Sequence, residues 1–280
     1  RKLIDRARSQ GLKSALASAV SYVQTRVAFG ARTLAYRLRP SAAVRRVPRS
    51  VAAADPVVTF VIPVYDREQM LIDCVRSVWA QGYPQTEVLL VLDGSPPGTR
   101  AVARQLAAED ARLRVIELPT QSGNAVIGRN VGISQARGEF VFFLDSDDLC
   151  RPGRIAETLS AFRAPDVDVV YGGYYLEFAS APERSHEVAP SDVSFDVVSK
   201  LNPIANSTAA VRRTVFTRYG MLKREMAYRE DHELWLRLCY FGCRFKRVAA
   251  SLSTIRIHGD NNEDNFRDRD ATFVERMGAT

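Results

Sequence analysis

Residues 138–148 read Gly138-Glu139-Phe140-Val141-Phe142-Phe143-Leu144-Asp145-Ser146-Asp147-Asp148, and the other elements can be placed around this segment. Its apolar run, rich in aromatic and β-branched residues, predicts a strand buried on both faces. Three carboxylates follow within four positions, and they repel one another unless a cation lies between them. Ligands gather at the carboxyl ends of strands in open α/β sheets, so Asp145 and Asp147 are candidates for binding a metal-bound phosphate ester. The alternative is a solvated acidic turn that caps a helix beginning near residues 148–152.

The composition is that of an ordinary globular protein, with 46% hydrophobic and 25% charged residues in a chain of 280. Four scattered cysteines are too few for a disulfide framework or a zinc ribbon, and they predict the reduced thiols of a cytoplasmic protein. The net charge of +7 is uneven: residues 1–50 hold twelve Lys or Arg against Asp5 alone, which leaves 27 basic and 31 acidic residues in 51–280. Because no run of eighteen apolar residues occurs in the sequence, we expect no membrane-spanning helix.

Residues 1–55 are expected to form a basic amphipathic helical leader followed by a linker. Apolar residues recur at spacings of mostly three and four up to Leu38, which predicts one or two helices broken near Gly11 or Gly30. Three alternatives stay open: the leader lies on an anionic membrane surface, packs on a partner or another domain, or is a plain solvated helix. Nucleic-acid binding is disfavoured because few aromatic residues are interleaved with the basic ones. The Pro-, Ala- and Arg-rich segment 40–55 has no period and predicts a linker.

From residue 57 onward the pattern alternates between strands and helices. Strands are predicted at 57–64, 87–93, 113–118 and 139–144, and helices at 67–81, 99–110 and 124–136. This order predicts an α/β fold with a doubly wound, mostly parallel sheet and flanking helices. The tips of three of these strands, at residues 64–66, 93–95 and 145–147, would then meet at one edge of the sheet.

The loop after the first strand argues against a dinucleotide-binding fold. It reads Pro63-Val64-Tyr65-Asp66-Arg67 and lacks the glycines that let a pyrophosphate approach the backbone. The sequence contains no Gly-x-x-x-x-Gly-Lys segment, so a P-loop is excluded as well. The charge of a bound phosphate would therefore be met by a metal at Asp145 and Asp147.

The second half of the chain is less regular and ends in a helix with an acidic start. A strand is predicted at 167–178, polar loops at 180–200 and 201–208, a strand and short helix at 209–219, and a helix over 228–238. One face of that helix carries Asp231, Leu234, Trp235 and Leu238, whereas Glu233 and Arg237 can pair outside it. Asp231 is then either a first-turn carboxylate favoured by the helix dipole or a general base at the mouth of a pocket.

Five segments carry a resemblance to a known family. They are Phe-Val-Ile-Pro-Val-Tyr-Asp-Arg (60–67), Leu-Asp-Gly-Ser (92–95), Gly-Arg-Asn-Val-Gly-Ile (128–133), Ala-Arg-Gly-Glu-Phe-Val-Phe-Phe-Leu-Asp-Ser-Asp-Asp (136–148) and Glu-Asp-His-Glu-Leu-Trp-Leu-Arg-Leu (230–238). In this order and spacing, from about residue 57 to 259, the sequence resembles glycosyltransferase family 2. The resemblance implies an inverting, nucleotide-sugar-dependent enzyme with the GT-A fold.

The resemblance also implies a role for each motif. Asp231 would be the catalytic base with Glu230 as its orienting neighbour, and Asp147 would hold Mg²⁺ or Mn²⁺ at the diphosphate. His258, in a late Arg-x-His element, would face the same metal or diphosphate. The residues expected to contact the nucleotide and sugar are Pro63, Tyr65, Asp66, Asp93, Arg129, Asn130 and Asp145. The sequence departs from the family's usual pattern in having Asp66 in place of Asn, Leu92 in place of an acidic residue, and Gly128 in place of Ala.

The resemblance implies sugar transfer from a nucleotide diphospho-sugar, with a UDP-sugar favoured, to a hydroxyl of a glycan or lipid-linked glycan. We expect a nucleotide-binding half at 56–165, an acceptor half with the catalytic base at 166–259, and a C-terminal tail at 260–280. The expected location is the cytoplasm, with peripheral attachment to the inner face of the cytoplasmic membrane through 1–50 as an option, and no nucleic-acid partner. Two alternatives are a catalytically inactive scaffold of the same fold and a nucleotidyltransferase, which would need a Gly-rich basic loop where only Arg67 stands.

Overall fold

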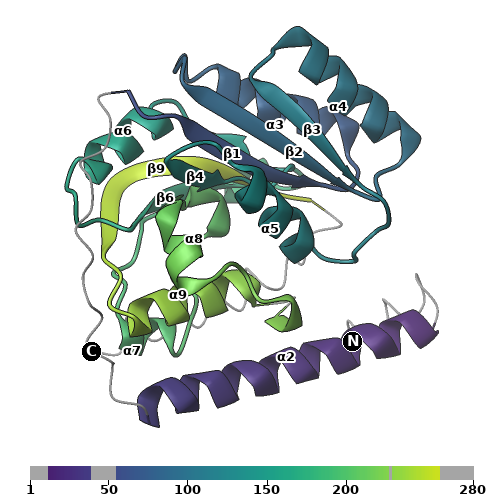
Figure 1. The fold of residues 1–280 in the computed structure, drawn as a ribbon. Helices are drawn as coiled ribbons and strands as arrows, with labels where there is room; N and C mark the ends of the chain where they lie inside the picture. The colour runs from purple at the N-terminus through teal and green to yellow at the C-terminus, as the bar shows by residue number, and fades with distance from the viewer. Residues whose placement is uncertain (1–11, 39–54, 227–228, 259–280) are drawn as a thin grey trace.

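A computed structural model describes residues 12–38, 55–226 and 229–258 (Figure 1). Residues 1–11 of the predicted leader, residues 40–54 of the predicted linker (40–55) and the whole predicted C-terminal tail (260–280) lie outside these described residues. Four parallel strands form the first half: β1 (Val58–Val64), β2 (Thr86–Asp93), β3 (Leu113–Leu118) and β4 (Phe140–Phe143), adjacent in the order β3-β2-β1-β4. They are connected by α3 (Glu68–Trp79), α4 (Pro97–Glu109) and α5 (Ala125–Gln135). The predicted doubly wound arrangement is confirmed.

The sheet of the first half is covered on both faces. Phe60 and Ile62 of β1 pack in a core with α3 and α4, whereas Val61 faces the opposite core beside α5 (Figure 1). Burial on both faces explains why these strands are near-continuous apolar runs rather than alternating ones. Gly132 lets α5 approach β1 closely, since a Cβ there would lie 2.3 Å from Val61 Cγ1.

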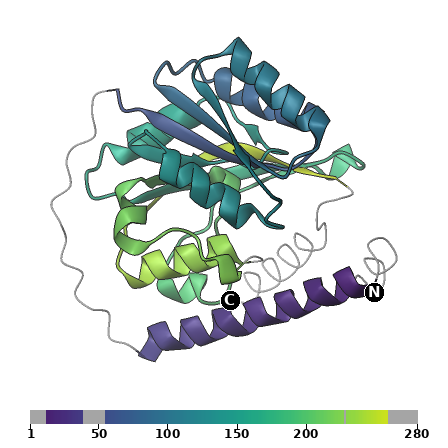
Figure 2. The ribbon, with the colours of Figure 1, turned by 45° about the vertical axis from the view of Figure 1, so that its right-hand side comes forward.

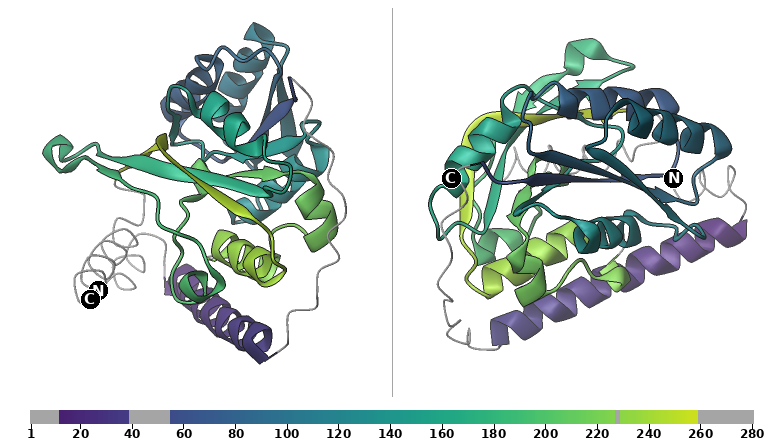
Figure 3. Two further views of the ribbon diagram at one scale, coloured as in Figure 1. Left: turned by 90° about the vertical axis from the view of Figure 1, so that its left-hand side faces the viewer. Right: turned by 45° about the horizontal axis from the view of Figure 1, so that its top comes forward.

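The second half continues the same sheet with mixed strand directions. β8 (Ala210–Arg212) lies antiparallel beside β4, and β6 (Val169–Phe178), β9 (Phe245–Ile257) and β5 (Leu149–Cys150) follow in that order. β7 (His186–Val188) pairs with β6, so the described part of the chain holds a nine-stranded sheet. The long strands β6 and β9 run parallel to each other through the middle of the molecule (Figure 3). Residues 148–152 are not helical: Leu149 and Cys150 form β5, and the next helix, α6 (Arg154–Phe162), begins after Gly153.

Short elements and one longer helix pack below the second half of the sheet. They are α7 (Phe195–Val198), the 3₁₀ turns η2 (Asn206–Thr208) and η3 (Arg224–Met226), α8 (Thr214–Tyr219) and α9 (Glu230–Tyr240), whereas the 3₁₀ turn η1 (Pro182–Arg184) connects β6 to β7. Leu234, Trp235 and Leu238 of α9 are buried, as the sequence predicted.

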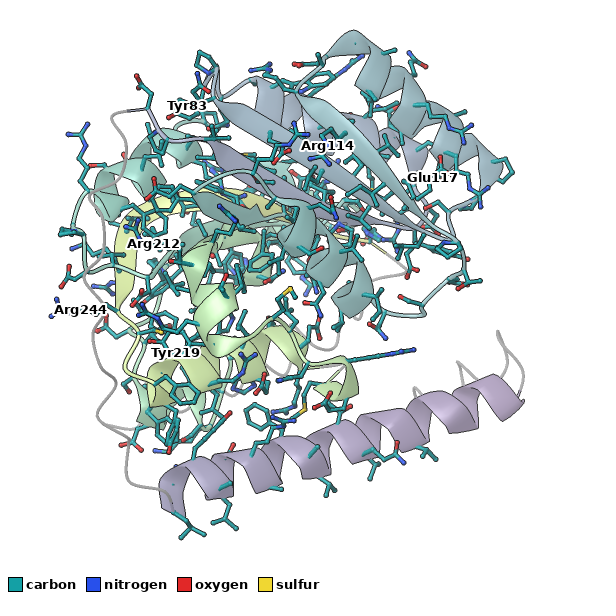
Figure 4. The ribbon with its side chains drawn as sticks, in the orientation of Figure 1. Tyr83, Arg114, Glu117, Arg212, Tyr219 and Arg244 are labelled. Carbon is teal, nitrogen blue, oxygen red and sulfur yellow. The ribbon has the colours of Figure 1, made fainter. Side chains whose placement is uncertain are left out.

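Glu233 and Arg237 form the predicted i, i+4 ion pair, at 3.0 Å, but both side chains are buried although they lie outside the predicted core-facing stripe. The reason is that Arg237 also donates to the carbonyl oxygens of Gly220 at 2.9 Å and Met221 at 2.8 Å, and to that of Tyr219 at the end of α8 (Figure 4). The guanidinium therefore satisfies backbone groups inside the fold, and the carboxylate compensates its charge.

Helix α2 (Leu12–Leu38) lies along one side of the molecule, next to α9 (Figure 1 and Figure 2). Of the two predicted positions for a break, Gly30 does not interrupt the helix, and Gly11 lies outside the described residues. Thr25 and Phe29 face inward and are buried, and packing of this face explains why a single glycine does not interrupt the helix. Among the described residues, no helix is long and apolar enough to cross a membrane.

Candidate active site

The three predicted strand ends do meet at one edge of the sheet. Ser95 Oγ, after β2, donates to the carbonyl oxygen of Val64 at the end of β1 at 3.0 Å. Arg67, two residues after Tyr65, donates to the Asp147 carboxylate at 3.0 Å. The end of β1 is therefore in contact with both neighbouring strand ends, as the parallel order of the strands requires.

Asp145, which follows β4, is connected to helix α9 by one buried arginine. Arg129 of α5 donates to Asp145 Oδ1 at 2.5 Å and to Glu230 Oε1 at 2.6 Å. Burial works against the charge of Arg129, but the two carboxylates raise its pKa above the ordinary value. Burial raises the pKa of Glu230 to about 7, although Arg129 acts in the opposite direction. The structure thus brings together three predicted residues from three separate motifs.

Asp231 stands at the start of α9 with both carboxylate oxygens engaged. Oδ1 accepts from the backbone N–H of His232 at 2.7 Å, and Oδ2 accepts from Asn202 Nδ2 at 2.8 Å. Each oxygen keeps a second lone pair, so the group can still accept a proton. Asn202 was not among the predicted site residues. Its position in the loop before β8 gave no local signal, because the contact joins residues 29 positions apart.

Asp147 and His258 are also brought together, as predicted for a metal site. His258 Nε2 lies 3.2 Å from Asp147 Oδ2, which also receives the guanidinium of Arg67. Burial favours the neutral carboxyl, but the hydrogen bond with His258 and the charge of Arg67 lower the pKa of Asp147 below its ordinary value.

Asp147 and His258 could supply two ligands to a divalent cation that completes its shell with substrate oxygens, with the carboxylate as the hard ligand and the imidazole as a softer one. Among the described residues no group of three or more His, Cys, Asp or Glu side chains could hold a metal ion. Mg²⁺ commonly takes only one or two carboxylates together with phosphate oxygens and water. Neighbouring ligands of such an ion lie about 3 Å apart, which agrees with the 3.2 Å between Asp147 and His258.

Asp148 is hydrogen-bonded inside the protein and stabilises the acidic segment from within. It is buried, accepting from Ser207 Oγ at 2.5 Å and from the backbone N–H of Arg256 at 3.2 Å. Burial, together with Asp147 and Asp145, raises its pKa well above the ordinary value. The Arg256 side chain donates to the carbonyl oxygen of Asp147 and, at 3.0 Å, to Asp73 of α3. The tip of the acidic segment is therefore fixed between β9 and α3.

The other residues predicted to contact the nucleotide differ in how exposed their side chains are and in whether they are hydrogen-bonded within the protein. Tyr65 is 45% exposed and the Asp66 side chain is 46% exposed, so both are accessible. Asp93 accepts from the backbone N–H and the hydroxyl of Ser122 at 2.7 and 2.6 Å. The Asn130 amide exchanges hydrogen bonds with the backbone N–H and carbonyl of Leu222, at 3.0 and 2.9 Å.

Pro63 explains one departure from the family pattern. A Cβ on Gly128 would come within 3.1 Å of Pro63 Cβ, so glycine at this position lets α5 lie against the end of β1. The substitution of the usual alanine is therefore a packing adjustment that leaves the neighbouring Arg129 in place.

The sequence model of the family described as "Glycosyl transferase family 2" matches residues 59–220, more than half of the 280 residues. The chain belongs to this family. TuaG of Bacillus subtilis, a putative teichuronic acid biosynthesis glycosyltransferase, is 29% identical over 211 residues, which cover 75% of this chain and 82% of TuaG. The glycosyltransferase GlyG of Streptococcus pneumoniae is 33% identical over 119 residues, which cover 42% of this chain but 39% of GlyG. The matched region thus spans well under half of the length of GlyG and most of the length of TuaG.

Two solved structures have a similar fold. Staphylococcus aureus TarS 1–349 in complex with UDP-GlcNAc superposes with a TM-score of 0.61 at 21% identity, covering 74% of this chain and 60% of TarS 1–349. The mannosyltransferase PcManGT of Pyrobaculum calidifontis, in complex with GDP-Man and Mn²⁺, superposes with a TM-score of 0.60 at 17% identity, covering 94% of this chain and 74% of the PcManGT chain. These likenesses confirm the predicted GT-A type of fold.

Proposed function

We propose that this chain transfers a sugar, hexosyl or related, from a nucleotide diphospho-sugar to an acceptor hydroxyl with inversion at the anomeric carbon. The observation that carries the proposal is the Asp145–Arg129–Glu230 connection, with distances of 2.5 and 2.6 Å. It holds the end of β4, where the donor phosphates would bind, at a fixed position relative to Asp231 at the start of α9. A donor and an acceptor could therefore be aligned on one rigid frame, which is the main requirement for a displacement without a covalent intermediate.

Asp231 acts as the general base in this proposal. Its carboxylate accepts the proton of the acceptor hydroxyl while that oxygen attacks the anomeric carbon from the face opposite the leaving diphosphate. Asn202 and the backbone N–H of His232 hold the carboxylate in place. Glu230 orients the start of α9 through its ion pair with Arg129.

Asp147 and His258 are the residues that would hold Mg²⁺ or Mn²⁺, which neutralises charge on the leaving diphosphate when bound. Arg67 forms an ion pair with the Asp147 carboxylate and so adds a positive charge beside the residues that would hold the metal. The complex of PcManGT with Mn²⁺ supports a divalent ion in this fold.

The donor is a nucleotide-sugar, for which we favour a UDP-sugar. TarS is described with UDP and with UDP-GlcNAc, whereas PcManGT is described with GDP-Man. We assign donor binding to residues 56–165, through Pro63, Tyr65, Asp66, Asp93, Arg129, Asn130 and Asp145. We assign the acceptor and the base to 166–259.

The acceptor in this proposal is a glycan or a lipid-linked glycan, handled at the cytoplasmic face of the membrane. The support is that relatives are described as proteins of teichuronic acid and O-antigen biosynthesis. The cysteines Cys74, Cys150, Cys239 and Cys243 are free, in accord with a reducing compartment.

Titration calorimetry with UDP, GDP and dTDP, each with Mn²⁺ and with EDTA, tests the donor site first. Metal-dependent binding of one nucleotide is expected. Asp231→Asn should then lower release of that nucleotide from its sugar conjugate by at least about a hundredfold and leave nucleotide binding unchanged. Asp196→Asn, on an exposed carboxylate of α7, is the control. Near-native turnover in Asp231→Asn would refute the assignment of the base, and absence of nucleotide binding would favour an inactive scaffold.

A further inference from the structure

Helix α2 has two different faces, and only one of them is used by the fold. On the inner face Thr25 and Phe29 are buried, and the ring centroid of Phe29 lies 4.3 Å from that of His232 in α9. Tyr36 stacks on Tyr240 at the other end of α9, with centroids 4.4 Å apart. Arg32, on the same side, pairs with Glu225 at 2.5 Å. These contacts fix the rotation of α2 about its own axis.

The opposite face of α2 carries an exposed apolar row, which we call the outer stripe: Val20, Val23, Val27, Leu34 and Leu38. On a helix of 3.6 residues per turn these positions fall within an arc of about 60°, centred about 180° from the inner face. Each of the five side chains is between 54% and 74% exposed. In the described part of the chain they are five of the eight large apolar side chains that are exposed. Such a concentration marks an interaction surface rather than ordinary scatter.

The charge around the outer stripe indicates what would cover it. Helix α2 contains no acidic residue, and helical spacing places Arg26 and Arg37 beside the outer stripe, whereas Arg32 is on the inner face; the first 50 residues hold twelve basic residues against Asp5. A second copy of the chain would bring two equally basic helices together, which like-charge repulsion opposes. An anionic lipid surface supplies both an apolar layer for the stripe and negative charge for its basic surroundings.

We propose that the outer stripe of α2 inserts into the surface of an anionic lipid bilayer, with the helix lying in the plane of the surface. This inference refines the membrane location in the proposed function, and its biological meaning depends on that function. Its test, however, does not require sugar transfer. Because Phe29 packs on His232, the lipid-facing helix is in direct contact with the turn of α9 that carries Asp231. Because α2 lies next to α9 (Figure 2), the arrangement would hold the catalytic base close to a membrane that presents a lipid-linked acceptor.

Co-sedimentation of the 1–280 chain with lipid vesicles tests the inference. Phosphatidylcholine vesicles are compared with vesicles in which about a third of the lipid is phosphatidylglycerol. We expect binding to the anionic vesicles only, and at least about a tenfold loss of binding in the triple variant Val23→Ser/Val27→Ser/Leu34→Ser. Val57→Ser is the matched control, because Val57 is exposed and apolar but lies outside α2. Circular dichroism verifies that each variant is folded.

Three outcomes would overturn the inference. They are failure of the wild-type chain to bind anionic vesicles, equal binding of the triple variant, and a dimer in solution that the triple variant abolishes, since the occupant would then be a second copy. Calorimetry with nucleotide and Mn²⁺ on the same samples separates this result from the proposed function. In the wild-type chain, nucleotide binding without lipid binding counts against the outer stripe alone, whereas lipid binding without nucleotide binding counts against the donor site.

Discussion

Replacing Arg129 by methionine tests the central connection of the candidate site. The variant keeps the length of the side chain but removes the guanidinium that joins Asp145 at 2.5 Å and Glu230 at 2.6 Å. Breaking a buried ion pair by removing one partner costs about 3–5 kcal/mol, because the other charge is left uncompensated. We expect the lower end, about 3 kcal/mol, since the Asp145 side chain is 35% exposed and can be rehydrated. At roughly 2–4 °C per kcal/mol, the melting temperature would fall by roughly 6–12 °C.

The loss of stability in Arg129→Met should also depend on pH. The pKa of Glu230 is about 7 in the intact protein, against an ordinary value of 4.5, because burial raises it more than Arg129 lowers it. Without Arg129 this folded-state pKa rises further. A carboxyl whose pKa is higher in the folded than in the unfolded state costs stability as the pH rises above the unfolded value. The difference between variant and wild type should therefore be smallest near pH 5 and grow toward pH 8.

Urea unfolding followed by circular dichroism at pH 5 and pH 8 measures both effects. The control is Arg104→Met, which removes an ion pair with Glu117 in which the Arg104 side chain is 66% exposed, and which should leave stability nearly unchanged. The reasoning would be refuted if Arg129→Met lost less than about 1 kcal/mol at pH 8, or if its loss were the same at both pH values.

Two further variants test the site and its frame. Asn202→Ala removes the hydrogen bond to Asp231 and should lower kcat about tenfold or more, with the KM for the donor unchanged. This factor corresponds to the roughly 1.5–3 kcal/mol of a hydrogen bond to a charged group. A rise in KM as large as the fall in kcat would indicate a structural role instead. Gly132→Ala would place a Cβ 2.3 Å from Val61 Cγ1 and should destabilise the fold by about 1–3 kcal/mol in thermal unfolding. Gly30→Ala, where a Cβ would meet open space on α2, is its control, and equal stability of the two variants would contradict the close packing of α5 on β1.

Local sequence patterns were sufficient for the first half of the fold. The apolar runs of β1, β2 and β4 are buried on both faces, and the acidic residues after β4 do lie at the edge where the other strands end. The family motifs also named Arg129, Glu230 and Asp231, which prove to be neighbours around one buried guanidinium or on the same helix turn.

Local patterns failed where a polar residue is satisfied by a distant part of the chain. Glu233 and Arg237 were placed outside the core by helical periodicity, yet they are buried because Arg237 meets backbone carbonyls after α8. The alternative interpretation of the acidic segment, a turn that caps a helix beginning near residues 148–152, also missed β5, because Leu149 and Cys150 pair with β9 about a hundred residues later and the helix begins only at Arg154.

What the sequence determined by itself was the order of the elements, the edge of the sheet that carries the acidic residues, and the chemical types of the candidate residues. These follow from side-chain periodicity and from the rule that parallel strands end at one edge, both of which act over short distances along the chain. Only the tertiary structure decided which polar groups meet, because Asp147, Asp148 and Arg129 each have one partner that lies 101 to 111 positions away, in His258, Arg256 and Glu230 respectively. It also decided which face of α2 is left open, because that depends on where α9 packs.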